Sequence, residues 1–305
     1  MAPVALAATG GFARRHTVRC RRRKPPGRRY RGVAVTGSLP NMVIIGVQKC
    51  GTTALHSYLA RHPEISMSKP KELDFFITGK GGRWELGLDW YRERFDPSAP
   101  VRGESSPNYT ADPRFPGVAE RMARTIPDAK LIFMVRDPIA RVLSNYVHRY
   151  SNRTDSRPLE QAVLDPASEY VARSRYHHQL SLFLEHFPSE QILVLEQDEL
   201  SHDGRETLPR VFRFLGVRDD VWRDAFEKRR LESSSRRRRT ALGSQVAKRV
   251  SMKTWRGIRD RRLFSKPFER PEMSDELRAQ VAELLREDIA KFRELTGRDF
   301  ANWSV

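Results

Sequence analysis

The stretch that decides the fold is Met-Val-Ile-Ile-Gly-Val-Gln-Lys-Cys-Gly-Thr-Thr at residues 42–53. Its first half is a short apolar run rich in β-branched side chains, which predicts a buried strand over residues 42–47. The chain then turns at Gly51 and leads into Leu55 and Leu59, which are spaced as on one face of a helix. The stretch therefore predicts a strand, a loop and a helix in immediate succession.

The same order recurs further along the chain. Residues 130–135, Lys-Leu-Ile-Phe-Met-Val, predict a second buried strand, and residues 142–146 continue with helical spacing. Residues 176–187 predict an amphipathic helix, and residues 191–195 predict a third apolar strand. This alternation predicts an α/β fold, a P-loop-like three-layer domain with a central parallel β-sheet flanked by helices.

The end of the chain breaks the pattern and then restores it. Residues from about 229 to 270 are crowded with Arg and Ser, and we interpret them as a mobile loop over the site. Ser274 is a typical N-cap, and the helix expected after it carries one apolar stripe. The stripe consists of Leu277, Val281, Leu284, Leu285, Ile289 and Phe292. We interpret this helix as structural packing.

The chain is strongly basic, with 56 Lys and Arg against 38 Asp and Glu and a net charge of +18. Such an excess suits a polyanion, whether nucleotide, sulfated glycan, nucleic acid or membrane surface. Residues 1–40 hold ten Lys or Arg and no acidic residue, so we expect a disordered tail there and a single domain over 41–305. The tail is a targeting segment, an anion-binding arm or a dispensable start.

Other features bound the cellular setting. No apolar run reaches the length of a membrane span, and the start lacks a secretory signal core, so we expect a soluble protein. The two cysteines, Cys20 and Cys50, offer no disulfide framework, which suits a reducing, cytoplasmic location. His177 and His178 lack partners at metal-ligand spacing, so we expect no metal site.

A strand that leads through a glycine turn into a helix start is the backbone arrangement that binds phosphate. The residues in that position are Lys49, Cys50, Gly51, Thr52 and Thr53. The loop is not a standard Walker A loop, because the lysine precedes the second glycine instead of following it. A lysine there can reach the bridging oxygen of a donor and neutralise the departing phosphate. The alternative is an ordinary surface lysine beside a tight turn.

A second candidate for anion binding is Arg136, which ends its predicted strand and precedes Ser144 by eight residues. Strand ends on one edge of such a sheet converge on a common ligand crevice. Arg136 can pair bidentately with a phosphate that Ser144 also touches. The alternative is that Arg136 merely pairs with its neighbour Asp137 or caps a backbone carbonyl.

These motifs, in this order, resemble those of the sulfotransferases that use 3′-phosphoadenylyl sulfate (PAPS), and are most similar to the heparan sulfate N- and O-sulfotransferase type. The segments that carry the similarity are residues 46–55, 136–138 and 141–146. The resemblance as a whole covers most of residues 41–216, and the end of the chain at residues 295–303 also resembles the family. The resemblance implies in-line transfer of a sulfuryl group from PAPS to a hydroxyl or amine of a carbohydrate-like or other small acceptor, without a metal.

The resemblance also implies residue roles for the donor. Lys49 to Thr53 would form the 5′-phosphosulfate loop, and Arg136 and Ser144 would hold the 3′-phosphate. The run from Arg236 to Arg239 stands where the family has a late loop over the nucleotide, and we expect Arg238 to add another phosphate contact.

For the acceptor, Lys71-Glu72-Leu73-Asp74-Phe75-Phe76 resembles the family's Glu-x-x-Phe-Phe segment, which implies Glu72 as the general base. A carboxylate suits that role because the attacking hydroxyl or amine must lose a proton. Asp74 is a rival two residues away. Ser105 stands where the glycosaminoglycan enzymes usually carry Lys, so we leave the acceptor open among carbohydrates, lipids and secondary metabolites.

Two other functions compete with this interpretation. A P-loop kinase or NTPase would need a Lys after Gly51 and a strand-end Asp for Mg²⁺, and neither is clear in the sequence. A non-catalytic binder of nucleic acid or membrane would use the basic tail and the arginines at 236–239, with steeply salt-sensitive binding. We expect no specific nucleic-acid partner.

Overall fold

The computed structural model describes residues 37–222 and 237–305. Most of the expected basic tail, and residues 229–236 of the Arg-rich stretch, lie outside these residues. Within the described part of the chain, no helix combines the length and the apolar character that a membrane span requires.

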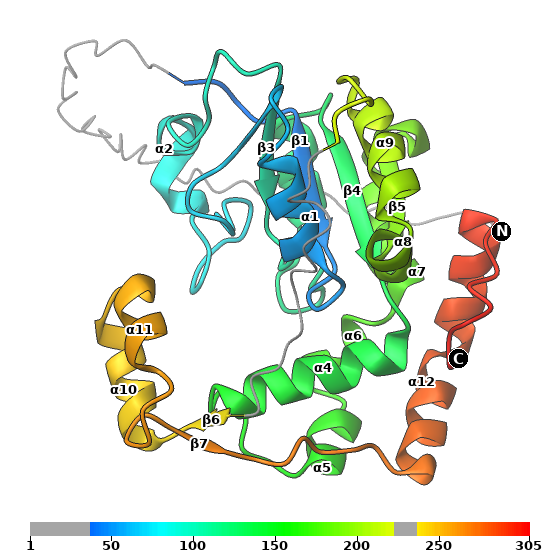
Figure 1. Cartoon of the computed structure of the whole chain (residues 1–305). Coiled ribbons are helices and arrows are strands. Elements are labelled where there is room, and N and C mark those ends of the chain that lie inside the picture. Colours follow the sequence, from blue (N-terminus) through cyan, green and yellow to red (C-terminus); the bar gives the residue numbers. More distant parts are fainter. Residues whose placement is uncertain (1–36, 223–236) are drawn as a thin grey trace, which may run out of the picture. The chain divides into compact units, whose positions relative to one another are not determined.

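A parallel sheet of five strands forms the centre of the fold, in the order β2-β3-β1-β4-β5 (Figure 1). The strands are β1 (Met42–Gly46), β2 (Ile65–Met67), β3 (Val101–Ser105), β4 (Lys130–Val135) and β5 (Ile192–Glu196). The strands predicted at 42–47, 130–135 and 191–195 are confirmed as β1, β4 and β5. Their near-continuous apolar runs are typical of parallel strands that are covered on both faces.

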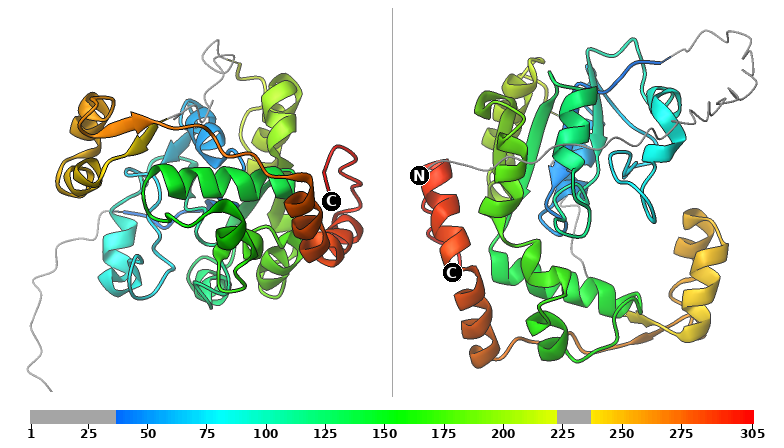
Figure 2. Two further views of the ribbon diagram at one scale, coloured as in Figure 1. Left: turned by 90° about the horizontal axis from the view of Figure 1, so that it is seen from below. Right: turned by 180° about the vertical axis from the view of Figure 1, so that it is seen from behind.

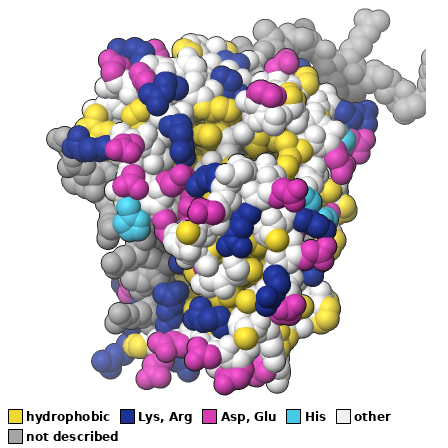
Figure 3. Space-filling view, turned by 90° about the vertical axis from the view of Figure 1, so that its right-hand side faces the viewer, with side chains coloured by type: hydrophobic (Ala, Val, Ile, Leu, Met, Phe, Trp, Pro, Cys, Tyr) yellow, Lys and Arg dark blue, Asp and Glu magenta, His cyan; other side chains and the backbone are white. Residues whose placement is uncertain are grey.

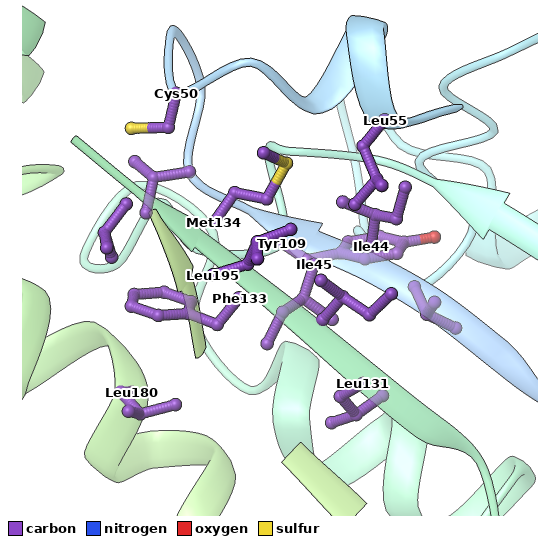
Figure 4. Close-up of a cluster of buried hydrophobic side chains, with 14 of the residues drawn as sticks. Ile44, Ile45, Cys50, Leu55, Tyr109, Leu131, Phe133, Met134, Leu180 and Leu195 are labelled. Atoms are coloured by element: carbon purple, nitrogen blue, oxygen red, sulfur yellow. The ribbon is translucent and has the colours of Figure 1, made fainter. Parts of the chain in front are cut away.

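Helices cover both faces of this sheet, which confirms the predicted three-layer α/β fold. Figure 4 shows Leu55 on one side of β4 and Leu180 on the other. The longer helices are α1 (Thr52–Leu59), α3 (Val118–Thr125), α4 (Pro138–Ser151), α7 (Tyr176–Leu184), α9 (Gly204–Leu215) and α12 (Asp275–Thr296). Shorter ones are α2 (Gly87–Arg92), α5 (Leu159–Leu164), α6 (Glu169–Ala172) and α8 (Gln197–His202).

The core follows the alternation of side chains along β4. Leu131 and Phe133 lie on the same side of the strand as Leu180, and Met134 lies on the opposite side (Figure 4). Each of these three β4 side chains is fully buried. Successive side chains of a strand point to opposite faces, so β4 fills the layers above and below the sheet alike.

The sequence analysis missed β2 and β3. β3 reads Val-Arg-Gly-Glu-Ser, which shows neither an apolar run nor a clear alternation. A Cβ on Gly103 would overlap the side chains of Met67 and Met42 from the two neighbouring strands. The two methionines therefore pack closely over Gly103, and this packing involves residues distant in the sequence.

The final helix agrees with its prediction except at one position. Ser274 Oγ accepts a hydrogen bond from the Leu277 amide at 3.2 Å, as an N-cap does. Leu284 is 47% exposed and does not belong to the stripe. The other five predicted positions are buried. Figure 2 shows the chain folding back along α12, where Phe300 and Trp303 stack on Phe292.

Part of the Arg-rich stretch has regular structure instead of the expected loop. Strands β6 (Arg237–Arg239) and β7 (Ser265–Pro267) pair antiparallel, and between them lie α10 (Ala241–Arg249) and α11 (Met252–Ile258) (Figure 2). Thr240 and Ser251 cap these two helices by accepting the amides of Gly243 and Thr254. The high content of Arg and Ser concealed these two short helices.

A buried carboxyl organises the loop that follows β2. Glu104 is fully buried and accepts hydrogen bonds from the hydroxyls of Tyr91, Ser106 and Tyr109. The Tyr109 hydroxyl in turn accepts the Phe75 amide at 2.8 Å. Burial raises the pKa of Glu104 to about 7. This network fixes the backbone beside the candidate base.

The raised pKa of Glu104 predicts a pH effect on stability. The folded protein holds this proton more tightly than the unfolded chain, so its contribution is complete below the usual pKa of 4.5 and is lost as the pH rises through about 7. Urea denaturation should therefore show a larger loss of unfolding free energy between about pH 5 and about pH 8 for wild type than for Glu104→Gln. Equal losses would contradict this assignment.

Candidate functional site

The candidate site lies where the order of the sheet reverses. The chain leaves β1 for β2 and β3 on one side, whereas β4 and β5 lie on the other side, so the segments after β1 and β4 emerge next to each other. In open α/β sheets ligands bind at such switch points, outside the carboxyl ends of the strands. The Val47 amide donates to the Met134 carbonyl at 2.7 Å and ties the loop after β1 to β4.

The loop after β1 presents free amides at the start of α1. Lys49 and Gly51 adopt left-handed backbone conformations, with φ of 76° and 86°. The amides of Gly51, Thr52 and Thr53 donate to no backbone carbonyl of the described residues, because the helical bonds begin with the Ala54 amide. Free amides and the helix dipole together favour an anion at this point.

Three basic side chains converge on this loop. The pKa of Lys49 is lowered, first by burial and then by the positive charges of Arg136 and Arg141, with Arg270 adding less. Within the described residues, no carboxylate forms an ion pair with any of Lys49, Arg136 and Arg141. Asp137 does not pair with Arg136, because its carboxylate caps α4 through the Ala140 amide. The alternative of an Arg136–Asp137 pair is therefore wrong.

Arg141 is the most constrained of these three cations. It is completely buried, and it donates to the Ser174 hydroxyl and to the Tyr170 carbonyl. Its Nη1 atom has no hydrogen-bond partner among the described residues. A guanidinium held this firmly adds a fixed positive charge beside the loop.

Cys50 joins the two motifs by packing. Its thiol is fully buried, 3.7 Å from the Tyr176 hydroxyl, and burial raises its pKa to about 11. The Tyr176 hydroxyl donates to the Arg136 carbonyl at 2.8 Å. Since the Cys50 amide already donates to Val47, the residue offers neither thiol nor amide to a ligand.

Glu72 lies on the loop that the Glu104 network supports. Its φ is 64°, an uncommon left-handed conformation that is held by a bond from its amide to the Ser105 carbonyl at 3.1 Å. Its carboxylate lies 2.5 Å from the Lys71 ammonium, and 43% of the side chain is exposed. The carboxylate is therefore paired with a lysine and still accessible to a ligand.

Asp74, the rival base, is placed differently. Burial raises its pKa to about 6, and both of its carboxylate oxygens accept from the Asn108 amide at 3.3 Å. Arg173 holds Asn108 from the other side through a bond of 3.2 Å. The geometry therefore favours Glu72 as the accessible carboxylate and Asp74 as a member of the supporting network.

His148 on α4 is a site residue that the sequence analysis missed. Partial enclosure lowers its pKa first, and the charges of Lys49 and Arg239 lower it further, whereas Glu72 acts in the opposite direction. Lys49 and Glu72 thus lie within electrostatic reach of one imidazole. The sequence could have indicated His148 by its position four residues after Ser144, which places both residues on the same face of a helix.

The remaining predicted residues lie along α4. Ser144 is nearly buried on the side of α4 shared with Arg141, and its hydroxyl has no hydrogen bond among the described residues. Arg238 also contacts α4, but it stacks on Tyr150 at 3.8 Å and donates to the Tyr150 hydroxyl at 2.9 Å. The charges of Lys49 and Glu72 thus both act on His148, whereas Arg238 is engaged by Tyr150.

The uncompensated charge at Lys49 predicts an effect on stability. In ligand-free buffer near pH 7, Lys49→Met should raise the unfolding free energy by about 1 kcal/mol, because the half-buried ammonium and its cationic neighbours oppose folding. Urea denaturation measures this, with the exposed Lys266→Met as the control. A destabilised Lys49→Met protein would show that the ammonium has a partner.

The chain is similar to known proteins both in sequence and in fold. A family model described as "Sulfotransferase domain" matches residues 39–293. A heparan sulfate glucosamine 3-O-sulfotransferase 3B1 of Mus musculus is 28% identical over 274 residues, covering 86% of this chain and 64% of the relative. A bifunctional heparan sulfate N-deacetylase/N-sulfotransferase 1 of Caenorhabditis elegans is 31% identical over 203 residues, covering 59% of this chain.

The chain spans 22% of the length of that nematode relative. Among solved structures, a sulfotransferase from Alicyclobacillus acidocaldarius superposes with a TM-score of 0.64 at 25% identity. That match covers 88% of this chain and 100% of the other. The fold is therefore shared over most of the chain.

Proposed function

The chain belongs to the sulfotransferase domain family, and from this membership we propose that it transfers the sulfuryl group of PAPS to a hydroxyl or amine of an acceptor. The resemblance that the sequence motifs indicated is confirmed at the level of the family, and so is a transferase of sulfuryl groups. The donor, the acceptor and the residue roles belong to the proposal.

The observation that carries the proposal is the group of cations at the switch point. Lys49, Arg136 and Arg141 lie around free helix amides without a carboxylate partner in the described chain. Burying positive charge without a counter-charge is costly, so such a group is retained where an anionic ligand supplies the counter-charge. PAPS carries phosphates at both ends of its ribose, which matches two anion elements on neighbouring strands.

For the donor, we assign the 5′-phosphosulfate to Lys49 and to the amides from Gly51 to Thr53. Arg136 and Ser144 are assigned to the 3′-phosphate, with Arg238 as a further contact that would have to leave Tyr150. An approaching anion raises the pKa of Lys49, so the lysine stays protonated when it meets the bridging oxygen. A protonated lysine stabilises the negative charge that develops on the leaving phosphate.

For the acceptor, Glu72 is assigned as the general base. Its carboxylate is accessible, and its charge acts on the pKa of His148, as the charge of Lys49 also does. The acceptor oxygen or nitrogen loses its proton to Glu72 as it forms the bond to sulfur, and the bond from sulfur to the bridging oxygen breaks on the side of Lys49. We propose a carbohydrate-like or other small acceptor, transfer without a metal, a cytoplasmic location, and a catalytic domain at 41–305.

Binding of 3′-phosphoadenosine 5′-phosphate (PAP) tests the donor site. Isothermal calorimetry in metal-free buffer should show PAP binding that weakens at least tenfold in Arg136→Ala, because a bidentate charged contact is lost. The control is Arg262→Ala, an exposed arginine distant in sequence from both motifs. Preference for ATP with Mg²⁺ over PAP would favour the P-loop NTPase alternative instead.

The assignment of the base predicts a separation of binding from turnover. Glu72→Gln should lower kcat by about 10²–10⁴-fold while PAP affinity stays unchanged, because proton removal is impaired and the anion elements remain. Asp74→Asn is the matched control and should retain most turnover. Single-turnover rates with radiolabelled PAPS measure both variants, and a larger loss in Asp74→Asn would reverse the two roles.

A further inference from the structure

A cavity of about 70 Å³ lies where β6 and α11 meet the C-terminal end of α4. Its lining includes the residues Arg237, Arg239, Arg259, Trp255 and Asp260. The volume is several times what one water molecule needs, so a group of several heavy atoms fits. Three arginines against one carboxylate leave the lining with an excess of positive charge.

Two of the three arginines are fixed in place by other contacts. Arg237 donates to the Ser265 hydroxyl at 2.9 Å and to the Ser265 carbonyl at 2.8 Å. Arg239 lies over the Trp255 ring at 4.9 Å. Successive side chains of a strand point to opposite sides, so β6 turns these two arginines to the cavity and Arg238 to Tyr150. The cavity wall is therefore preorganised, which lowers the entropy cost of binding.

The chain's own carboxylate indicates which chemistry fits the cavity. Asp260 lies 3.6 Å from Arg259 and 4.0 Å from Arg237, and its side chain is 67% exposed. Ion pairs this long and this exposed are weak. An external oxyanion can displace Asp260 and gain paired contacts from guanidinium groups, which suit carboxylate, sulfate and phosphate geometry.

The position of the cavity relates it to the proposed transfer site. Ser151, which also lines it, follows Ser144 on α4 by seven residues, or about 10 Å along a helix. Arg239 lies within electrostatic reach of His148, as Lys49 does. The cavity therefore adjoins the helix that carries Ser144, the proposed 3′-phosphate contact, and it is built from residues other than Lys49, Arg136 and Arg141.

We propose that this cavity is an oxyanion subsite that binds an acidic group of the acceptor. The acceptor is then an acidic molecule whose carboxylate, sulfate or phosphate lies against Arg239 and Arg259 while its nucleophile faces Glu72. This assignment to the acceptor rests on the proposed function, whereas the anion subsite itself does not. A free inorganic oxyanion, such as sulfate or phosphate, has the same chemistry as the acidic group of an acceptor. The experiment below distinguishes binding of the acceptor's acidic group from binding of a free anion.

The test titrates inorganic sulfate into PAP-saturated protein by calorimetry, so that the donor elements are already occupied. Arg259→Gln should weaken sulfate binding about tenfold, as expected for loss of one charged contact. Arg262→Gln removes the same charge from an exposed position outside the cavity lining and should leave binding unchanged. Asp260→Asn removes the internal competitor and should tighten binding. Equal affinities in Arg259→Gln and Arg262→Gln would overturn the subsite.

A matched pair of sugars, one with and one without a carboxylate, tests whether the bound anion belongs to the acceptor. Glucuronate should bind PAP-saturated wild type more tightly than glucose, and Arg259→Gln should abolish the difference. Sulfate binding that depends on Arg259 without any preference for glucuronate would overturn the acceptor assignment. If wild type fails to bind PAP, the proposed donor site fails, but the comparison of Arg259→Gln with Arg262→Gln in PAP-free protein still tests the cavity.

Discussion

The rest of the structure depends on the pairing of β1 with β4 at the centre of a parallel sheet. Their register aligns Val43 with Leu131, and the bond from the Val47 amide to Met134 extends the pairing into the first loop. Because the chain proceeds in opposite directions across the sheet from this pair, both following segments open on one edge. Lys49 and Arg136 meet for that reason, although 87 residues separate them.

This meeting has an electrostatic cost, which the surrounding core makes tolerable. Arg141 is locked by Ser174 and Tyr170, and Tyr176 fixes the carbonyl of Arg136. A group of cations held in this way keeps its geometry without a ligand, and preorganised charge stabilises a transition state without rearrangement. On the face shown in Figure 3, by contrast, Lys and Arg are interspersed with Asp and Glu.

A second buried network positions the opposite side of the site. Glu104 accepts hydrogen bonds from three hydroxyl groups, and one of these, the Tyr109 hydroxyl, accepts a hydrogen bond from the Phe75 amide. The segment from Glu72 to Asp74 can then hold two left-handed residues, which otherwise disfavour a single conformation. The candidate base thus owes its place to a strand, β3, whose sequence gives little sign of being one.

Local patterns determined the strands β1, β4 and β5, the α/β class, the strand, loop and helix at residues 42–59 and the capped final helix, because each depends on neighbours close in the sequence. The packing of Met42 and Met67 over Gly103, the combined action of Lys49 and Arg239 on His148, and the exposure of Leu284 depend on contacts between distant segments. The helices α10 and α11 carry too little apolar surface for periodicity to reveal them. The sequence alone therefore indicated which residues have the right chemistry, and only tertiary packing decided which of them share one place, since distances across the sheet are set by the packing of the core.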